Sequence, residues 1–355
     1  MTGATVSVVP VILYILITSS LMKKKHISLI ALLIVIKSLA FANTNNPIAD
    51  TLVHGKVLFD TDGKPVNAHG PGVMYHQGVY YLFGEIKNGK TWLVPGQNWE
   101  DYRVPAGGIS CYSSVDLKHW KYRGVALKPT VNDPGSDLDT GRVIERPKVI
   151  YNERTKKFVM WMHIDKNDYN YSRGGVAISD SPVGPYRYLG SVKPNDQMLR
   201  DMTLYKDDDG KAYLVYSSED NNTMHVCLLS DDYLKPTKTY SRIFENQKRE
   251  SPAIFKNGGK YYLITSGCTG WSPNAASYAV ADKVTGPWTQ QGNPCKGLNA
   301  EVTFFSQGAF VLPVIDKPGK FIFMGDVWNK TDLERSTYLW LPLQVNNGKI
   351  EIYNP

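Results

Sequence analysis

The stretch Asn257-Gly258-Gly259-Lys260-Tyr261-Tyr262-Leu263-Ile264-Thr265 joins a tight polar turn to a short aromatic strand, and it decides the fold because it recurs. A Gly-rich turn before an apolar run is the chemistry of a β-hairpin. Four more aromatic-rich strands follow polar turns in the same way: Val79–Phe83, Phe158–Met162, Ala212–Tyr216 and Phe321–Met324. Each of the five copies is preceded by another short strand: Gly72–Tyr75, Lys148–Tyr151, Met202–Tyr205, Ala253–Phe255 and Ala309–Val314.

These five hairpins, whose aromatic strands start 49 to 79 residues apart, come without a convincing amphipathic helix. Repeated sheet units of this size predict an all-β chain folded as a five-bladed β-propeller. The alternative is a two-sheet β-sandwich, which does not need five equivalent hairpins. Because no internal linker interrupts the repeats, we expect residues 43–355 to form a single propeller domain.

Residues 1–42 have a different character. A basic run at Met22-Lys23-Lys24-Lys25 precedes the uncharged apolar run Ile27–Ile36 and the small-x-small pattern Ala40-Phe41-Ala42. This order is typical of a secretory signal peptide, and the apolar run is short for a membrane span. We therefore expect residues 1–42 to be an upstream segment and a signal peptide, with Met22 as the true start. A membrane hairpin is the alternative.

The formal net charge of +7 does not indicate a nucleic-acid partner. Residues 1–42 hold four Lys and no acidic residue, so the remaining chain carries only +3. A net charge of +3 on a protein of this size does not indicate the concentrated basic surface that nucleic acids bind. The sequence predicts an exported protein, periplasmic or extracellular, that is a monomer without a membrane anchor after signal cleavage.

The four cysteines have no metal-ligand spacing such as CxxC. Export permits disulfides, and Cys268 and Cys295 lie in turn-rich segments where they could pair. Cys111 and Cys227 lie in apolar runs, where a cysteine usually serves as a small buried side chain.

A ring of polar residues is predicted at the centre of the propeller, because the first strand of every blade lines the central channel. The residues just before those strands are Asn67-Ala68-His69, Glu145, Asp201, Glu250 and Gln307. Three carboxylates at one repeated position indicate a site. The alternative is structural, with Glu145 and Glu250 bound to their neighbours Arg146 and Arg249.

Converging carboxylates in an exported, aromatic-rich protein favour glycoside hydrolysis. The glycosidic oxygen needs a proton from an acid that burial and a neighbouring carboxylate keep protonated. Sugar rings stack on aromatic side chains, and Tyr169, Trp271 and Trp328 lie in loops just after the strands.

At these residues the chain resembles glycoside hydrolase family 43, and most closely its exo-β-1,3-galactanase branch. The resemblance runs from about residue 67 to Leu343 and so covers nearly the whole of residues 43–355. Its motifs are Asn67-Ala68-His69-Gly70, Tyr81-Leu82-Phe83-Gly84-Glu85, Glu145-Arg146-Pro147, Arg200-Asp201, Glu250-Ser251-Pro252, Gly270-Trp271, Ser306-Gln307 and Gly325-Asp326-Val327-Trp328.

The resemblance implies a role for each matching residue. Glu250 corresponds to the general acid, and Asp201 to the carboxylate that raises the pKa of the acid and orients it. Glu145 corresponds to an extra carboxylate that holds the terminal galactose, and Gln307 to a residue that positions or deprotonates the attacking water. Glu85, Tyr169 and Trp271 correspond to sugar contacts.

The chain departs from most of that family at the first inner strand. Most members have an Asp general base where this chain has Asn67-Ala68-His69-Gly70, a loss shared with the exo-galactanase branch. His69 is a candidate base or substrate contact, although we favour a structural role. An amide such as Gln307 can act as a base only through its imidic tautomer, or it can hold water without taking its proton.

The sequence thus predicts an inverting exo-glycosidase that releases galactose from β-1,3-galactan, with acid and base sides about 6.5–9.5 Å apart. No metal or organic cofactor is implied. Insertions at Thr91–Val104 and Lys128–Arg142 are expected to wall one end of the channel. The alternatives are an α-L-arabinofuranosidase or β-xylosidase on the same fold, and a non-catalytic glycan-binding propeller.

Overall fold

Five sheets follow one another along the chain in the computed structural model, which describes residues 53–315 and 317–354. Four of them are antiparallel with four strands each, and the fifth has six strands. In the first four blades the strands pair in chain order, with the first strand at the centre and the fourth at the outer edge. Blade 1 comprises β2 (His69–His76), β3 (Val79–Lys87), β6 (Ala106–Ser114) and β7 (Lys121–Leu127). Blade 2 comprises β8 (Val143–Asn152), β9 (Lys157–Asp165), β10 (Arg173–Ser179) and β11 (Arg187–Val192). Blade 3 comprises β12 (Met202–Lys206), β13 (Ala212–Ser218), β14 (Thr223–Leu229) and β15 (Pro236–Ile243). Blade 4 comprises β16 (Arg249–Asn257), β17 (Lys260–Gly267), β18 (Ser277–Ala281) and β19 (Thr289–Gly292).

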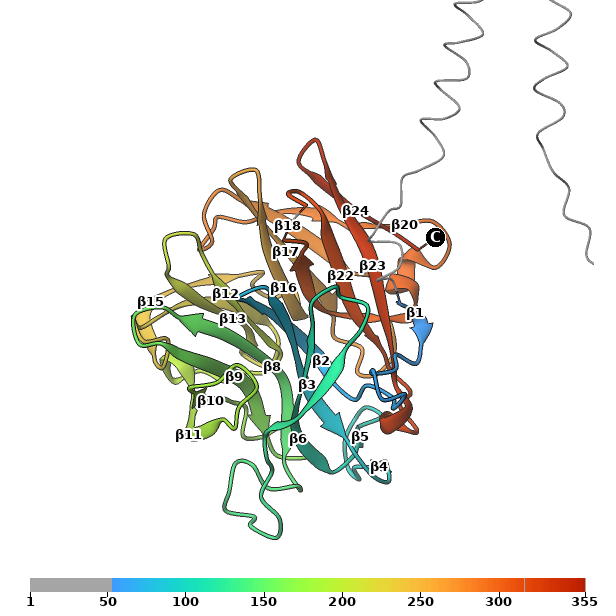
Figure 1. Cartoon of the computed structure of the whole chain (residues 1–355). Coiled ribbons are helices and arrows are strands. Elements are labelled where there is room, and N and C mark those ends of the chain that lie inside the picture. The colour runs from blue at the N-terminus through green and yellow to red at the C-terminus, as the bar shows by residue number, and fades with distance from the viewer. Residues whose placement is uncertain (1–52, 316, 355) are drawn as a thin grey trace, which may run out of the picture. The chain divides into compact units, whose positions relative to one another are not determined.

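Blade 5 closes the ring with strands from two distant parts of the chain. It comprises β21 (Gln307–Pro313), β22 (Phe321–Val327), β23 (Thr337–Asn346) and β24 (Lys349–Tyr353). The short β20 (Cys295–Lys296) pairs in parallel with β24, and β1 (Val53–Lys56) pairs with β23. The inner strands contact one another in the order β2, β8, β12, β16, β21 and back to β2. Figure 1 shows the blades in chain order around this centre.

This arrangement is the predicted five-bladed β-propeller. All ten strands expected from the hairpin repeats are present, as the inner two strands of each blade. The helical turns in the described residues are the 3₁₀ helices η2 (Pro194–Asp196), η3 (Ala300–Phe305) and η4 (Leu333–Arg335). None of the helical turns in this part of the chain has the length and apolar character needed to cross a bilayer. The signal peptide expected within residues 1–42 lies outside the described residues.

The core is divided into five apolar clusters, one between each pair of adjacent blades. Each cluster is built from the large side chains that the sheets bury on their facing sides. Between blades 5 and 1, for example, Trp120 contacts Trp340 edge to face with their ring centroids 6.0 Å apart. Burial of this area between sheets is the main favourable term that holds the blades in a ring. A rigid ring keeps the channel-lining side chains at fixed positions.

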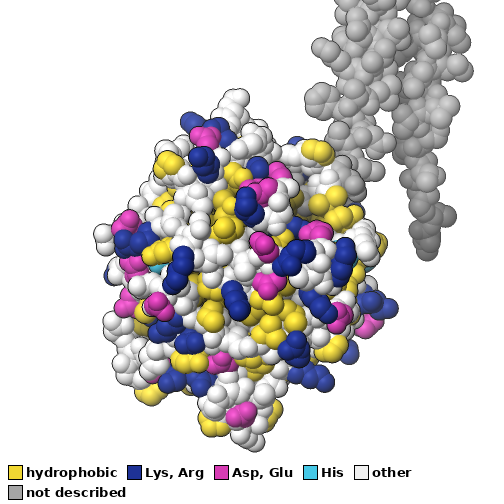
Figure 2. Space-filling view, turned by 90° about the vertical axis from the view of Figure 1, so that its left-hand side faces the viewer, with side chains coloured by type: hydrophobic (Ala, Val, Ile, Leu, Met, Phe, Trp, Pro, Cys, Tyr) yellow, Lys and Arg dark blue, Asp and Glu magenta, His cyan; other side chains and the backbone are white. Residues whose placement is uncertain are grey.

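The surface mixes both signs of charge. On the face shown in Figure 2, Lys and Arg side chains alternate with Asp and Glu, and apolar side chains are scattered between them. Several of these charges are exposed ion pairs, such as Lys260 with Asp282 at 2.6 Å. Exposed pairs of this kind contribute little stability, about 0–1 kcal/mol each.

Candidate active site

The predicted ring of polar residues exists, and strand register gives its five members equivalent positions. Opposite each ring residue, on the second strand of its blade, lies another polar side chain. The pairs are His69 with Glu85, Glu145 with His163, Asp201 with Ser217, Glu250 with Ser266, and Gln307 with Asp326. Ring residues therefore converge on the channel from all five blades.

A backbone kink follows the ring residue in three of the blades. Gly70, Arg146 and Ser251 all have left-handed φ angles, of 55°, 52° and 53°, and each precedes a proline. The strand register shifts at these points, as in a β-bulge. Bulges commonly re-aim side chains next to active sites. At Gly70 a side chain would also crowd the Arg146 backbone, since an added Cβ would lie 3.1 Å from its Cα.

Glu250 has the properties of a general acid. Burial, with the neighbouring Asp201 carboxylate adding to it, raises the pKa of Glu250 to about 8. Its Oε1 accepts a hydrogen bond from Nε2 of Gln307 at 2.8 Å, and Asn221 Nδ2 approaches its Oε2 at 3.4 Å. A carboxyl group with this pKa is mostly protonated at neutral pH, so it can donate a proton to a leaving group.

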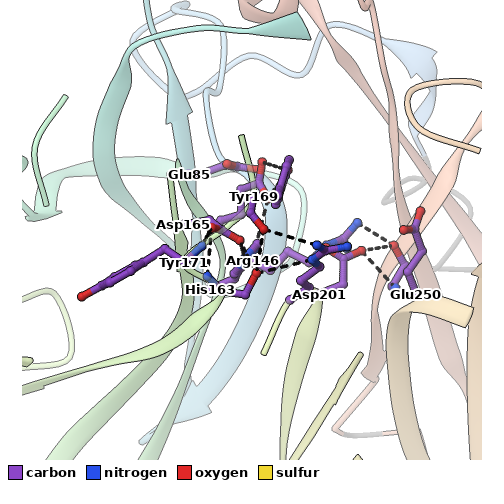
Figure 3. A network of polar contacts seen from close by, with 12 residues as sticks. Glu85, Arg146, His163, Asp165, Tyr169, Tyr171, Asp201 and Glu250 are labelled. Atoms are coloured by element: carbon purple, nitrogen blue, oxygen red, sulfur yellow. Dashed lines mark hydrogen bonds and ion pairs between the residues drawn. The ribbon is translucent and has the colours of Figure 1, made fainter. Parts of the chain in front are cut away.

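Arg146, on blade 2, contacts side chains of three other blades. Its Nε contacts Oδ1 of Asp201 at 2.8 Å, and its Nη2 donates to Oε1 of Gln307 at 2.8 Å and to Oγ of Ser251. Burial alone would lower the pKa of Arg146, but the surrounding carboxylates, Asp201 first among them, raise it. Figure 3 shows Arg146 between Asp201 and the group around His163.

Asp201 is held by three donors. Besides Arg146, it accepts hydrogen bonds at Oδ2 from the backbone N–H and the hydroxyl of Ser251, at 3.1 and 2.9 Å. Ser251 directly follows Glu250, so these bonds tie the backbone beside the acid to Asp201. The arrangement lets one carboxylate influence both the position and the protonation of the next.

Glu145 belongs to a second charged group on blade 2. Tyr169 donates its hydroxyl to Glu145 at 3.1 Å, and Nδ1 of His163 lies 3.3 Å from Oε2 of the same carboxylate. Burial alone would raise the pKa of Glu145, but His163 and Lys87 outweigh it and hold the pKa below its ordinary value. Burial opposes the charged form of His163, yet Asp165 and Glu145 together raise its pKa to about 9. At neutral pH Glu145 is therefore ionised, whereas Glu250 is mostly protonated.

Glu85 and Lys87 form a buried pair on β3. Nζ of Lys87 lies 3.0 Å from Glu85 and 3.8 Å from Glu145, and it lies 5.6 Å from the ring centroids of Trp271 and Trp328. Burial raises the pKa of Glu85 to about 7 although Lys87 opposes the shift. Two aromatic rings, a cation and two carboxylates thus meet on one side of the site.

Most of these residues line an open cavity of about 670 Å³ at one end of the channel, whereas Lys87, His163 and Ser251 lie behind its lining. The cavity is lined by eight of the residues expected from the sequence: Glu85, Glu145, Tyr169, Asp201, Glu250, Trp271, Gln307 and Trp328. Aromatic rings and titratable carboxylates therefore face one cavity, which is the combination that the sequence associated with a carbohydrate site.

His69 is the exception, because it is not among the residues that line the cavity and so the structure gives no support to its expected contact with substrate. It is 1% exposed, its Nδ1 lies 3.1 Å from Oδ1 of Asp326, and its ring stacks on Tyr338. Asp326 also accepts a hydrogen bond from the backbone N–H of Gly70 at 3.1 Å. His69 therefore joins blade 1 to blade 5, which is the structural role we favoured.

Only the first of the two insertions reaches the cavity. Gln97, Asn98 and Trp99 of the segment 91–104 are among its lining residues, whereas those of 128–142 are not. Trp99 packs over Gly270, where an added Cβ would lie 2.9 Å from the Trp99 ring. The guanidinium of Arg103 lies 4.3 Å from the ring centroid of Tyr169, so it holds the insertion against a predicted sugar contact.

Four residues of the site were not predicted as site residues from the sequence: Arg146, His163, Lys87 and Arg103. Arg146 was considered only as a partner of Glu145, but it pairs with Asp201 instead. Similarly, Arg249 donates to Thr265 rather than to Glu250. His163 could have been found by counting along the blade 2 hairpin, because it lies directly opposite Glu145. The contacts between blades have no such signal in the spacing of residues.

Cys268 and Cys295, which the sequence suggested could pair, do not form a disulfide. All four cysteines are free: Cys295 is buried on β20, whereas Cys268 lines the cavity. Burial, together with the charge of Glu250, raises the pKa of the Cys268 thiol, so this cysteine is a poor nucleophile. Cys111 and Cys227 are buried in the apolar clusters, as predicted.

One group of side chains has a composition that suits a metal. Single donor atoms of Glu145, His163 and Asp201 lie within 4.8 Å of one another. In this structure, however, Glu145 and Asp201 are already compensated by His163 and Arg146. A cation placed there would face two positive side chains, so the donor set does not favour one.

Comparison with known proteins agrees with the geometry. The model of the glycosyl hydrolases family 43 matches residues 87–308, more than half of the chain. Among curated proteins, the beta-D-galactofuranosidase xynD of Aspergillus niger is 26% identical over 230 residues, which are 60% of this chain and 65% of that protein. The chain thus spans about two thirds of this relative.

Solved structures are similar over more of the chain. A GH43 β-1,3-galactosidase solved with galactodeoxynojirimycin is 41% identical, with a TM-score of 0.79 over 86% of this chain and 99% of that one. An exo-β-1,3-galactanase from Phanerochaete chrysosporium, solved with β-1,3-galactotriose, is 34% identical with a TM-score of 0.75, covering 85% and 66%. An exo-β-1,3-galactanase from Clostridium thermocellum is 34% identical with a TM-score of 0.73, covering 85% and 64%.

Proposed function

The chain belongs to glycosyl hydrolases family 43, and from this we propose that it is an exo-acting hydrolase that releases galactose from the non-reducing end of β-1,3-galactan. The observation that carries the proposal is Glu250, a carboxyl group whose pKa is raised to about 8 inside a cavity lined by aromatic rings. The similar structures with galactose-type ligands support galactose as the sugar.

The proposed reaction is a single displacement. Glu250 donates its proton to the glycosidic oxygen as the bond to the anomeric carbon breaks and its electrons pass to that oxygen. One water attacks the anomeric carbon from the opposite face and loses a proton to solvent, and solvent returns a proton to Glu250. Because one displacement occurs, the anomeric configuration inverts.

The side chains around the acid have distinct proposed roles. Asp201 keeps Glu250 protonated, since its negative charge disfavours a second charge nearby. Ionised Glu145 and the Tyr169 hydroxyl that it binds present hydrogen-bonding groups to the terminal galactose, with Glu85 beside them. Trp271 offers a stacking surface for the sugar face. Trp99 and its insertion border the cavity, which favours action at a chain end.

We further propose that the enzyme is exported and acts as a monomer. A polymeric substrate and the signal-like pattern of Met22–Ala42 both favour a periplasmic or extracellular location.

A substrate panel tests this function. Purified protein at pH 6–7 is incubated with β-1,3-galactan, arabinan, xylan and a β-D-galactofuranoside, and the released monosaccharides are quantified. We expect galactose from β-1,3-galactan at a rate at least about tenfold above the others. Arabinose or xylose release would favour the arabinofuranosidase or xylosidase alternative, and binding without any release would favour the glycan-binding alternative. Each of these outcomes would overturn the proposal.

A further inference from the structure

The two ends of the Gln307 amide face different kinds of partner. Its Oε1 accepts hydrogen bonds from Nη2 of Arg146 at 2.8 Å and from the indole Nε1 of Trp328 at 3.0 Å. Its Nε2 donates to Oε1 of Glu250 at 2.8 Å and lies 3.3 Å from Oγ of Ser266. Gln307 thus has partners at every hydrogen-bonding position that an amide offers.

The hydrogen-bonding groups around Gln307 determine which end of its amide is the oxygen. A guanidinium and an indole N–H can only donate, so an NH₂ group turned toward Arg146 and Trp328 would meet two donors with no acceptor. The reverse orientation of the amide is therefore excluded by its surroundings. Trp328, which the sequence suggested as a sugar platform, also has a structural task inside the site.

The same two donors, Arg146 and Trp328, also determine which tautomer the Gln307 side chain adopts. In the imidic form, –C(OH)=NH, the oxygen carries a hydrogen that needs an acceptor. Both polar neighbours of this oxygen are donors, so that hydrogen would meet another hydrogen, and at least one existing bond would be lost. An unmatched polar group in such a site is unfavourable. The surroundings of Gln307 therefore select the ordinary amide.

From this geometry we propose that Gln307 remains an amide and donates a hydrogen bond to the acid, rather than accepting a proton from water. Arg146 and Trp328 are then positioning residues that aim the Nε2–H group at Oε1 of Glu250. Oε1 receives this hydrogen at 2.8 Å, whereas the donor that faces Oε2, Nδ2 of Asn221, lies at 3.4 Å, so the transferable proton is placed on Oε2. The effect of this hydrogen bond on catalysis rests on the proposed function of Glu250 as the general acid. The tautomer of Gln307 does not depend on that function.

Neutron diffraction of the deuterium-exchanged full chain at pH 6, below the raised pKa of Glu250, tests the proposal without substrate. We expect two deuterium atoms on Nε2 of Gln307, none on its Oε1, and one on Oε2 of Glu250. Deuterium on Oε1 of Gln307, or on Oε1 of Glu250, would overturn it. Since no sugar is present, failure here is distinct from failure of the proposed function.

Two substitutions test the catalytic consequence. Trp328→Phe keeps an aromatic ring but removes the donor that fixes Gln307, so kcat should fall about tenfold with KM changed less than twofold. Gln307→Glu supplies a true base in place of the amide but removes the N–H donor and adds a charge beside Glu250. We expect kcat to fall at least about tenfold and the basic limb of the pH profile to move upward.

An imidic base would give the opposite pattern. Loss of a donor from its oxygen would leave kcat of Trp328→Phe unchanged or raised, and a carboxylate in its place would preserve activity in Gln307→Glu. Either result would overturn the proposal. Trp288→Phe is the matched control, because Trp288 lies on the turn before β19, outside the cavity, and its indole N–H has no hydrogen-bond partner.

Discussion

Glu250→Gln is expected to lower kcat on β-1,3-galactan by a factor of about 10² to 10⁴, the usual contribution of a general acid. The amide has the shape of the carboxyl group, and its oxygen still accepts the hydrogen bond that Gln307 donates at 2.8 Å. The site should therefore keep its geometry and its affinity for galactose. Only the transferable proton is lost.

An aryl galactoside separates this chemistry from a general disturbance of the site. A nitrophenolate leaving group needs little protonation, so Glu250→Gln should hydrolyse it with a much smaller loss than galactan. Glu301→Gln, at an exposed position of η3, is the matched control and should behave like wild type. Equal losses on both substrates, or unchanged activity on galactan, would remove Glu250 from its role as acid.

Asp201→Asn is expected to shift the pH dependence of activity to lower pH. Burial and the Asp201 charge raise the pKa of Glu250 to about 8, so removal of that charge lowers the pKa and ionises the acid at lower pH. The basic limb of kcat/KM, near pH 8 in wild type, should move down by about one unit or more. Activity at pH 8 should fall at least about tenfold, with a smaller loss at pH 5.5.

The same substitution tests the role of Arg146. Removal of one partner of a buried pair commonly costs about 3–5 kcal/mol, but Asn keeps an acceptor for Arg146, so the loss of stability should be smaller. Urea unfolding measures it, with Asp62→Asn on the exposed surface as control. A basic limb that stays near pH 8 while stability falls would limit Asp201 to a structural role.

The fold could be predicted because its repeats lie in the chain itself. Turn residues and aromatic strands, such as Asn257–Thr265, specify hairpins locally, and five hairpins specify the ring. The polar ring followed from the same repeats, since equivalent strands place Glu145, Asp201, Glu250 and Gln307 at equivalent positions.

Contacts between blades could not be predicted in this way. Arg146 binds Asp201 and Gln307 from other blades because its backbone has a left-handed φ of 52°, which nothing in the hairpin pattern indicates. Likewise, the pairing of His69 with Asp326 joins the first blade to the last across 257 residues of sequence. The local pattern of Cys268 and Cys295 suggested a disulfide, but turn-rich surroundings carry no information about the distance between two thiols.

The anomeric form of the first sugar released tests the central claim most directly, because it reports both the hydrolysis and its single displacement. Wild-type protein is mixed with β-1,3-galactotriose at pH 6, and ¹H NMR spectra are recorded before mutarotation mixes the anomers. The account predicts that α-galactose appears first, together with β-1,3-galactobiose, and that Glu250→Gln slows the appearance of both by a factor of about 10² or more. First release of β-galactose, or no release of galactose, would contradict it.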